Sequence, residues 1–239
     1  MKGFPVWTMV VCLSVVFGIS VADALEPTSS VEGLKAEVEG AAERHPGIVM
    51  SRGGEYPNTD VGNYVAAIGR HLIEGTGRYD DFVFHFTILR SRSPFAFSIA
   101  GGYVYLSVGI LSLASCEAEI AAVMAHELGH VLLHHGSKFG EAYLHLKQGT
   151  LQEMRAALEE VREEQEREAD EFSIKMLVDA GYDPRAQASF YQSLVHFFEI
   201  VGHVPPDWRE RERVRRLTAL AISYPLPGTS AVCSPLNPL

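Results

Sequence analysis

The sequence predicts an α+β fold that is mostly helical, with a small β-sheet packed against helices that carry a metal-binding pattern. Three observations support this class. Most of the chain shows the apolar spacing of amphipathic helices, and three short segments rich in β-forming residues lie together between residues 81 and 107. A His-Glu-Leu-Gly-His sequence at 126–130 follows them, within an apolar stretch that is typical of a buried helix.

Composition and charge narrow the class of protein. The chain has 239 residues, of which 47% are hydrophobic and 21% are charged, as in a globular protein with a sizeable core. Its formal net charge of -10 disfavours a nucleic-acid partner, because the phosphate backbone would repel the chain. We therefore expect no binding to nucleic acid.

Residues 1–24 have the three parts of a secretory signal peptide. Lys2 precedes the apolar run 6–19, and the small residues Ala22 and Ala24 stand where signal peptidase cleaves. We expect cleavage after Ala24 and export, to the periplasm or beyond. An uncleaved membrane anchor is the weaker alternative, because the apolar run is short for a span. No later apolar run reaches about 18 residues, so we expect no integral membrane segment after cleavage, and peripheral association with a membrane stays open.

Two helices are expected before the sheet. Residues 31–45 show loose helical periodicity, within an N-terminal extension that covers 25–57. Residues 58–73 show this periodicity more clearly, and the Gly-Thr-Gly sequence at 75–77 ends their helix. The main domain is expected to cover residues 58–224.

Three strands and a helix follow. Residues 81–89 alternate between apolar and polar side chains, and 95–99 and 103–107 are short β-rich runs separated by two glycines. A small sheet therefore precedes the helix with the His-Glu-Leu-Gly-His sequence. Ser115 is the expected N-cap of that helix.

His126 and His130 lie one helical turn apart on one face, so both imidazoles can reach a single metal ion. Glu127, between them, is then placed to act on water at the ion. Two histidines are too few, because a catalytic zinc site uses three protein ligands and keeps a fourth position open. One known pattern places a third His ten residues after the first, with a Gly between the second and third His. This chain does not fit that pattern, because position 136 is Gly136 and position 133 is Leu133.

Glu166 is the expected third ligand, from a long acidic helix at 151–179. Asp170 lies one turn later on the same face, where its carboxylate can accept the second ring N–H of a ligand His. The small residues Ala169 and Ser173 share this face and permit close approach of another helix. Taken alone, the acidic residues fit a solvated helix face, but carboxylates among apolar neighbours would be costly to bury without a metal.

Two further helices and a tail complete the chain. Asp183 and Pro184 are expected to start one helix. The last helix is expected at 207–222. The tail at 225–239 contains too many prolines to be helical.

Cys116 and Cys233 are the cysteines that remain after signal cleavage. In an exported protein such a pair can form a disulfide, which would tie the tail to the start of the metal-binding helix. Two free thiols are the alternative, since the sequence does not show that the two residues meet.

Three segments, 101–111, 117–131 and 166–170, together resemble peptidase family M48, the gluzincins typified by HtpX, BepA, the mitochondrial Oma protease and the Ste-type CaaX prenyl protease. The resemblance covers roughly residues 58–215. It implies a zincin-like metallopeptidase domain.

The resemblance also implies a role for each matching residue. His126, His130 and Glu166 correspond to the zinc ligands, and Glu127 corresponds to the general base. Asp170 corresponds to the carboxylate behind the ligands. These roles agree with the spacing argument.

Family members bind substrate backbone as an added β-strand, along a strand that precedes a Gly-Gly turn. By this resemblance, Phe97, Ser98, Ile99 and Ala100 are assigned to substrate binding. The Asn and the Pro of the family pattern are missing here. A strand that only packs on the core is therefore the alternative.

Relatives also carry a His followed by an Arg near the metal. His203 is the nearest match and is assigned a catalytic role at the transition state, with Arg209 or Arg213 as the Arg. Because the spacing is imperfect, a surface-loop His is the alternative. His134 and His135 follow the metal motif too closely to reach the same ion, and we expect them to serve packing.

The residues and the resemblance together imply an exported zinc-dependent endopeptidase that holds one Zn2+ per chain. We expect it to hydrolyse peptide bonds of polypeptides, such as misfolded envelope proteins, in protein quality control. The alternative is a zinc-binding chaperone-like or adaptor module on the same scaffold, with little or self-inhibited proteolysis.

Overall fold

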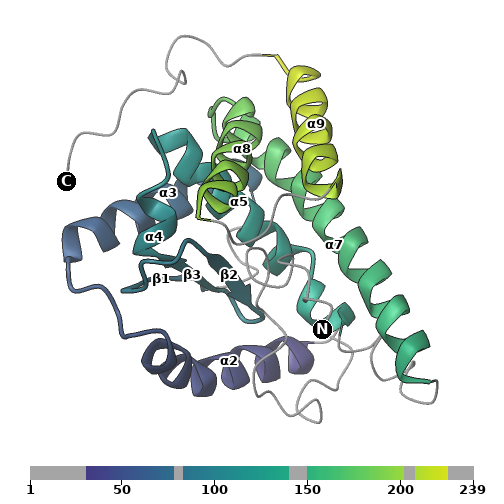
Figure 1. Ribbon diagram of the computed structural model, residues 1–239. Helices are drawn as coiled ribbons and strands as arrows, with labels where there is room; N and C mark the ends of the chain where they lie inside the picture. The colour runs from purple at the N-terminus through teal and green to yellow at the C-terminus, as the bar shows by residue number, and fades with distance from the viewer. Residues whose placement is uncertain (1–30, 78–82, 140–149, 202–207, 226–239) are drawn as a thin grey trace.

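The computed structural model describes residues 31–77, 83–139, 150–201 and 208–225, and Figure 1 shows their arrangement. The predicted signal peptide and almost all of the predicted tail lie outside the described residues. The named elements are α2 (Val31–Ser51), α3 (Thr59–Thr76), β1 (His85–Leu89), β2 (Ala96–Ile99), β3 (Tyr103–Ser107), α4 (Val108–Leu111), α5 (Glu117–Leu132), α7 (Leu151–Asp179), α8 (Arg185–Ile200) and α9 (Trp208–Ile222). The predicted α+β class, mostly helical, is confirmed.

The three predicted strands form one mixed sheet in the order β1-β3-β2. The middle strand β3 is parallel to β1 and antiparallel to β2, with Ser98 of β2 opposite Val104. Between β2 and β3, Gly101 and Gly102 have φ angles of 87° and 90°, which glycine adopts without strain. β2 is therefore an edge strand of this sheet.

Helices cover both faces of the sheet, with α2 below it and α3 and α5 above it in the view of Figure 1. Successive strand residues point to opposite faces. Phe97 and Tyr105 pack toward α2 and its Ala41, whereas Val104 and Leu106 pack in the main core with α3 and α5. Burial on both faces explains why these strands read as nearly continuous apolar runs.

Helix α5, which carries the His-Glu-Leu-Gly-His sequence, packs closely against α7. Gly129 makes this approach possible, since an added Cβ would lie 3.3 Å from the carbonyl oxygen and 3.4 Å from the Cα of Ala169. Ala169 and Ser173 are both fully buried. The small residues expected on this face of α7 therefore bring the two helices together.

Two carboxylates, of which that of Glu119 is buried, fix the start of α5. Glu117 accepts hydrogen bonds from the hydroxyl groups of Tyr64 and Tyr182, at 2.7 and 2.8 Å. Glu119 accepts from the backbone N–H of Ser115 at 2.7 Å. The N-cap is Cys116 and not Ser115, because the contact that closes this turn comes from the Glu119 side chain and not from the Ser115 hydroxyl.

Several element bounds differ from the prediction. α2 continues to Ser51, past the expected end at His45 and past Pro46. A proline removes a backbone donor from a helix, but Ile48 and Val49 pack against the sheet and this burial holds the helix beyond it. The short helix α4 was not predicted; the side chain of Ser107 caps it by accepting from the backbone N–H of Ile110.

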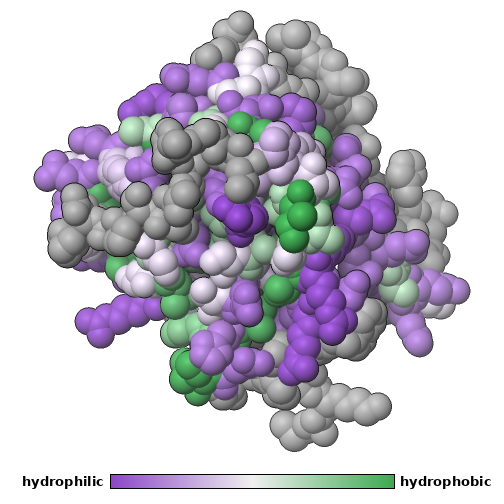
Figure 2. Space-filling model, turned by 90° about the horizontal axis from the view of Figure 1, so that it is seen from above, coloured by the Kyte–Doolittle hydropathy of each residue, from purple (hydrophilic) through white to green (hydrophobic). Residues whose placement is uncertain are grey.

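The face seen from above in Figure 2 is mainly hydrophilic, with hydrophobic residues in small separate groups. Among helices in the described ranges, we find none that combines the length and the apolar character needed to span a membrane. The exposed large hydrophobic residues come from several different elements: Met50, Val83, Ile200, Val201 and Ile222.

Candidate metal centre

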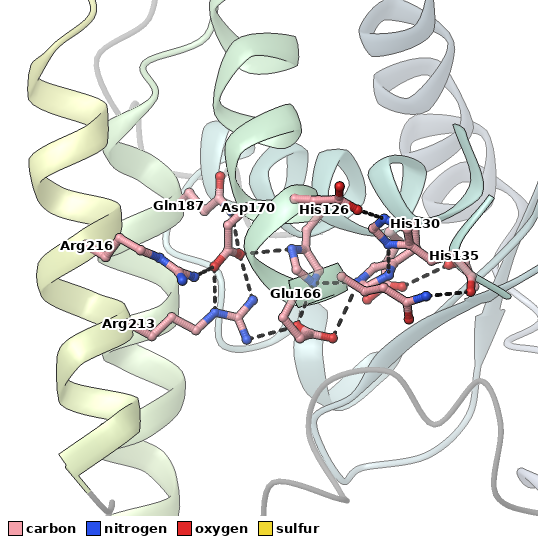
Figure 3. A network of polar contacts seen from close by, with 12 residues as sticks. His126, His130, His135, Glu166, Asp170, Gln187, Arg213 and Arg216 are labelled. Atoms are coloured by element: carbon pink, nitrogen blue, oxygen red, sulfur yellow. Dashed lines mark hydrogen bonds and ion pairs between the residues drawn. The ribbon is translucent and has the colours of Figure 1, made fainter. Parts of the chain in front are cut away.

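His126 and His130 of α5 and Glu166 of α7 converge on one point (Figure 3). The Nε2 atoms of the two histidines lie 3.2 Å apart. A carboxylate oxygen of Glu166 lies 3.4 Å from Nε2 of His126, and its second oxygen lies 3.5 Å from Nε2 of His130. All three residues are buried. The structure thus brings together the three residues that the sequence assigned to the metal.

These spacings fit a tetrahedral metal ion. Zinc binds imidazole nitrogen and carboxylate oxygen at roughly 2.0–2.2 Å, so two ligands of a tetrahedral site lie about 3.3–3.5 Å apart. The two histidine nitrogens lie close to that separation from each other, and each lies at about that separation from a different oxygen of Glu166. Two imidazole nitrogens and a carboxylate are also a donor set that zinc prefers.

The charges of the cluster favour a cation. Burial lowers the pKa of His126, but the carboxylates of Asp170 and Glu166 outweigh it and raise that pKa to about 9. Burial raises the pKa of Glu166, but Arg213 and the two histidines outweigh it and lower that pKa to about 2. A buried site that holds a negative charge on Glu166 and attracts a proton to His126 is suited to positive charge.

Asp170 lies behind His126. Its Oδ1 is 3.1 Å from Nδ1 of His126, an ion-pair distance at which the carboxylate favours a proton on Nδ1. Asp170 is fully buried. Burial raises its pKa, but Arg213 and the hydrogen bond to His126 hold that pKa well below its usual range.

Three residues whose contact with Asp170 the sequence did not predict complete its surroundings. Arg213 donates to both carboxylate oxygens at 2.7 and 2.9 Å, and Arg216 also donates to it. Gln187 donates to Oδ1 at 3.3 Å. Arg213 had been one of two candidates for a catalytic Arg, and no sequence signal indicated Arg216 or Gln187.

The two candidate arginines, Arg209 and Arg213, have different surroundings in the structure. Arg213 is 6% exposed, lies 4.6 Å from the ring centre of Tyr191, and its Nη1 is 3.1 Å from a carboxylate oxygen of Glu166. Arg209 lies one turn earlier in α9, 3.6 Å from the half-exposed Glu163. Of the two, Arg213 is the one for which the described residues show a contact with the metal cluster.

Glu127 is 2% exposed and accepts a hydrogen bond of 3.2 Å from the hydroxyl of Ser98 on β2. Burial, partly opposed by His126, raises the pKa of Glu127 to about 7. A carboxylate with a pKa near neutrality can both take and return a proton at neutral pH. The carboxylate is thus held between the metal cluster and the edge strand.

Two cavities among the described residues can be compared with the position of the metal cluster. One of about 50 Å³ is lined by His126, Glu127, Asp170 and Arg213 together with apolar residues of α5 and α8. A larger one of about 560 Å³ lies beside β1 and α3 and includes no residue of the metal cluster. The chemistry of the donor atoms, and not cavity size, identifies the candidate centre.

The residues assigned to substrate binding do not act alike. Phe97 and Ile99 are buried and pack in the cluster between the sheet and α2. Ser98 contacts Glu127, and Ala100 lies in the turn after β2. The side chains of Phe97 and Ile99 thus serve the core, and substrate binding by β2 stays a prediction.

Two other assigned residues cannot be placed. His203 lies outside the described residues, and so does Cys233. Cys116 is buried at the start of α5. The catalytic role of His203 and the pairing of the two cysteines stay predictions.

His135 is buried, as expected of a packing residue, but it also contacts a metal-cluster residue. Its Nδ1 lies 2.9 Å from Nδ1 of His130, and its Nε2 lies 3.1 Å from a carboxylate oxygen of Glu168. No sequence signal indicated this contact, because α5 ends at Leu132 and helical spacing no longer applies beyond it.

Comparisons with known proteins agree with the motif pattern. Residues 61–139 match the model of Peptidase family M48, a region that spans α3 to α5 and ends before Glu166. A putative beta-barrel assembly-enhancing protease of Vibrio cholerae is 27% identical over 168 residues, which cover 60% of this chain and 34% of that protein. The beta-barrel assembly-enhancing protease of Escherichia coli is 26% identical over 157 residues, or 55% of this chain and 32% of that protein.

A third relative matches a shorter part of this chain. The mitochondrial metalloendopeptidase OMA1 of Schizosaccharomyces pombe is 32% identical over 75 residues, which cover 31% of this chain and 22% of that protein. The matches to the two bacterial proteases span about a third of the length of each of those proteins.

Proposed function

The family match confirms the resemblance to peptidase family M48, and on this premise we propose that the chain is a zinc-dependent endopeptidase. One observation carries the proposal. The buried Glu127 adjoins a cluster of His126, His130 and Glu166, in which one ligand atom from each residue lies within 4.8 Å of the others and the donor set is one that zinc prefers.

In the proposed reaction, zinc, when bound, supplies Lewis acidity for the scissile carbonyl and the attacking water. Glu127 takes the proton from the attacking water and passes it to the leaving amine. Ser98 keeps the Glu127 carboxylate oriented through its hydrogen bond. Asp170 keeps His126 in the tautomer whose Nε2 is free to ligate.

The proposed substrate is an extended segment of polypeptide. β2 is an edge strand, and its residue Ser98 reaches the general base Glu127. A segment that pairs with the outer edge of β2 would therefore run past the metal centre. Main-chain hydrogen bonds would supply affinity with little dependence on substrate sequence.

We further propose that the protein is exported and acts in quality control of envelope proteins. The pattern of residues 1–24 supports export. The named activity of the bacterial relatives, enhancement of beta-barrel assembly, supports a substrate among envelope proteins. Peripheral contact with a membrane is compatible with this assignment.

A zinc-binding chaperone-like or adaptor module is the second candidate. One contact favours it: Nη1 of Arg213 lies 3.1 Å from the carboxylate of Glu166 and competes with a metal for that ligand. In this case the scaffold would bind zinc and unfolded protein with little cleavage.

A chelation experiment separates the two candidates. The full chain is incubated with an unfolded protein, and fragments are measured before chelation, after chelation and after zinc is restored. The peptidase account predicts cleavage that stops with the chelator and returns with zinc. Glu166→Gln should lower zinc content and cleavage together, whereas Glu164→Gln on the half-exposed face of α7 should change neither. Zinc binding and capture of the unfolded protein without fragments would support the adaptor account.

A further inference from the structure

We infer that His135 is a positioning residue for the metal centre, which sets the tautomer of His130 by accepting its Nδ1–H. This inference rests on the proposed zinc site. It gives His130 a neutral partner, in contrast with the carboxylate of Asp170 that stands behind His126.

Glu168, at the outer end of the chain of contacts from His130 through His135, determines which atom donates in each hydrogen bond. An ionised carboxylate only accepts, so the contact of 3.1 Å between Glu168 and Nε2 of His135 requires a proton on that nitrogen. A neutral imidazole carries one N–H, and Nδ1 of His135 is then an acceptor. The proton in the 2.9 Å contact between the two rings therefore belongs to Nδ1 of His130. This leaves Nε2 of His130 as a lone pair that faces the metal position.

The geometry around His135 holds the ring in this orientation. His135 is 2% exposed, and its ring meets that of His130 edge to face, with centres 4.9 Å apart and planes at 76°. Its carbonyl accepts a hydrogen bond of 2.9 Å from the side chain of the buried Gln165 on α7. Both the backbone and the ring of His135 are thus fixed.

The turn that brings His135 back to His130 is unusual. His134 has a φ of 56°, the left-handed region that non-glycine residues seldom adopt. It stands two residues after the end of α5, and a helical segment resumes at residues 135–139. A continued α5 would carry His135 away from the metal face, since five residues advance about 500° around a helix. The left-handed turn at His134 instead brings His135 back to His130.

The Nδ1 atoms of the two proposed ligand histidines therefore contact different partners, Asp170 behind His126 and His135 behind His130. Asp170 is fully buried and is neutralised by two arginines. Glu168, at the end of the other chain of contacts, is 42% exposed and lies 3.9 Å from Lys138. A loss of Glu168 should therefore be milder than a loss of His135, because water can replace an exposed acceptor.

The test measures zinc affinity by competition with a chelator in three variants of the full chain. His135→Phe keeps a ring but removes the acceptor, and it should weaken zinc binding roughly 10- to 100-fold. His135→Asn keeps an acceptor near the Nδ1 position and should recover most of that loss. Glu168→Ala should cause a smaller loss of a few fold, and it serves as a second route if His135→Phe does not fold.

Matched controls and a direct readout complete the experiment. His196→Asn, an exposed His on α8, and Glu171→Ala, on the exposed face of α7, should bind zinc as the wild type does. Nitrogen-15 NMR should find the proton of His130 on Nδ1. A proton on Nε2, or equal zinc affinity for wild type and His135→Phe, would overturn the inference.

The outcome also separates this inference from the proposed function. If the wild type fails to bind zinc, the proposed function fails, and the tautomer of His130 still decides the inference. If the wild type binds zinc and cleaves but the His135 variants match it, the inference alone fails.

Discussion

The guanidinium of Arg213 donates two hydrogen bonds to the carboxylate of Asp170, with Nη2 2.7 Å from Oδ1 and Nε 2.9 Å from Oδ2. This two-point contact between α9 and α7 is buried. It neutralises the carboxylate that supports His126. The last helix of the domain thereby becomes part of the metal centre.

Replacing Arg213 with Met should destabilise the protein by about 3–5 kcal/mol, because Asp170 and Glu166 would lose a buried positive partner. Urea denaturation measures the change. Arg215→Met is the matched control, since Arg215 is 77% exposed on the same helix and its replacement should change stability by less than about 0.5 kcal/mol. Equal stabilities of the two variants would contradict the structural role of Arg213.

Gly129→Ala should separate α5 from α7, because its Cβ would lie 3.3 Å from backbone atoms of Ala169 that cannot move independently. We expect a loss of about 1–3 kcal/mol in stability and weaker zinc binding. Gly62→Ala on α3 is the control, since its Cβ would meet nothing within 4 Å and helix propensity should make it neutral or stabilising. Thermal unfolding and zinc titration of both variants test this account; a Gly129→Ala variant as stable as Gly62→Ala would be inconsistent with it.

Ser98→Ala should lower kcat roughly tenfold and leave zinc content unchanged, because a hydrogen bond to a charged group is worth about 1.5–3 kcal/mol and this one orients Glu127. Steady-state cleavage of an unfolded substrate measures kcat and KM separately. Ser193→Ala, on an exposed part of α8, should leave both constants unchanged. A Ser98→Ala variant with wild-type kcat would show that the contact does not serve catalysis.

Asp183 links pH to stability at the start of α8. Its hydrogen bonds with Arg185 hold its pKa below the usual value, against the opposing effect of burial. A lowered pKa in the folded state adds stability above the pKa of the unfolded state, and this stability is lost as the pH falls through the folded-state value. Wild type should therefore exceed Asp183→Asn in stability at pH 6, by roughly 0.2–1 kcal/mol because Arg185 is half-exposed.

The difference between these two proteins should shrink steadily as the pH falls below about 4. Urea unfolding of both proteins at each pH isolates this effect, because other titrating groups are common to both. A difference that stays constant from pH 6 to pH 3 would rule out the proposed linkage.

Much of the fold could be predicted because its signals are local. The spacing of His126 and His130 required only a helix, and the two glycines between β2 and β3 marked their turn. The end of α2 was missed because packing of Ile48 on the sheet overrides Pro46. Local propensity yields to tertiary burial at that point.

The candidate site was predictable only in part, for a related reason. Glu166 and Asp170 share a face of one helix, so their spacing carried information. The contacts of Arg213, Ser98 and His135 depend on how distant elements meet, and helical or strand periodicity contains nothing about that. The left-handed turn at His134 adds a backbone reversal that no sequence rule anticipates.

The most direct test of the central claim compares wild type with Glu127→Gln, in zinc content and in cleavage of an unfolded protein. The account predicts one zinc per chain in both proteins and cleavage in the wild type only, because Gln retains the shape of Glu127 but cannot take a proton. Cleavage by the zinc-loaded Glu127→Gln variant at the wild-type rate would contradict the account.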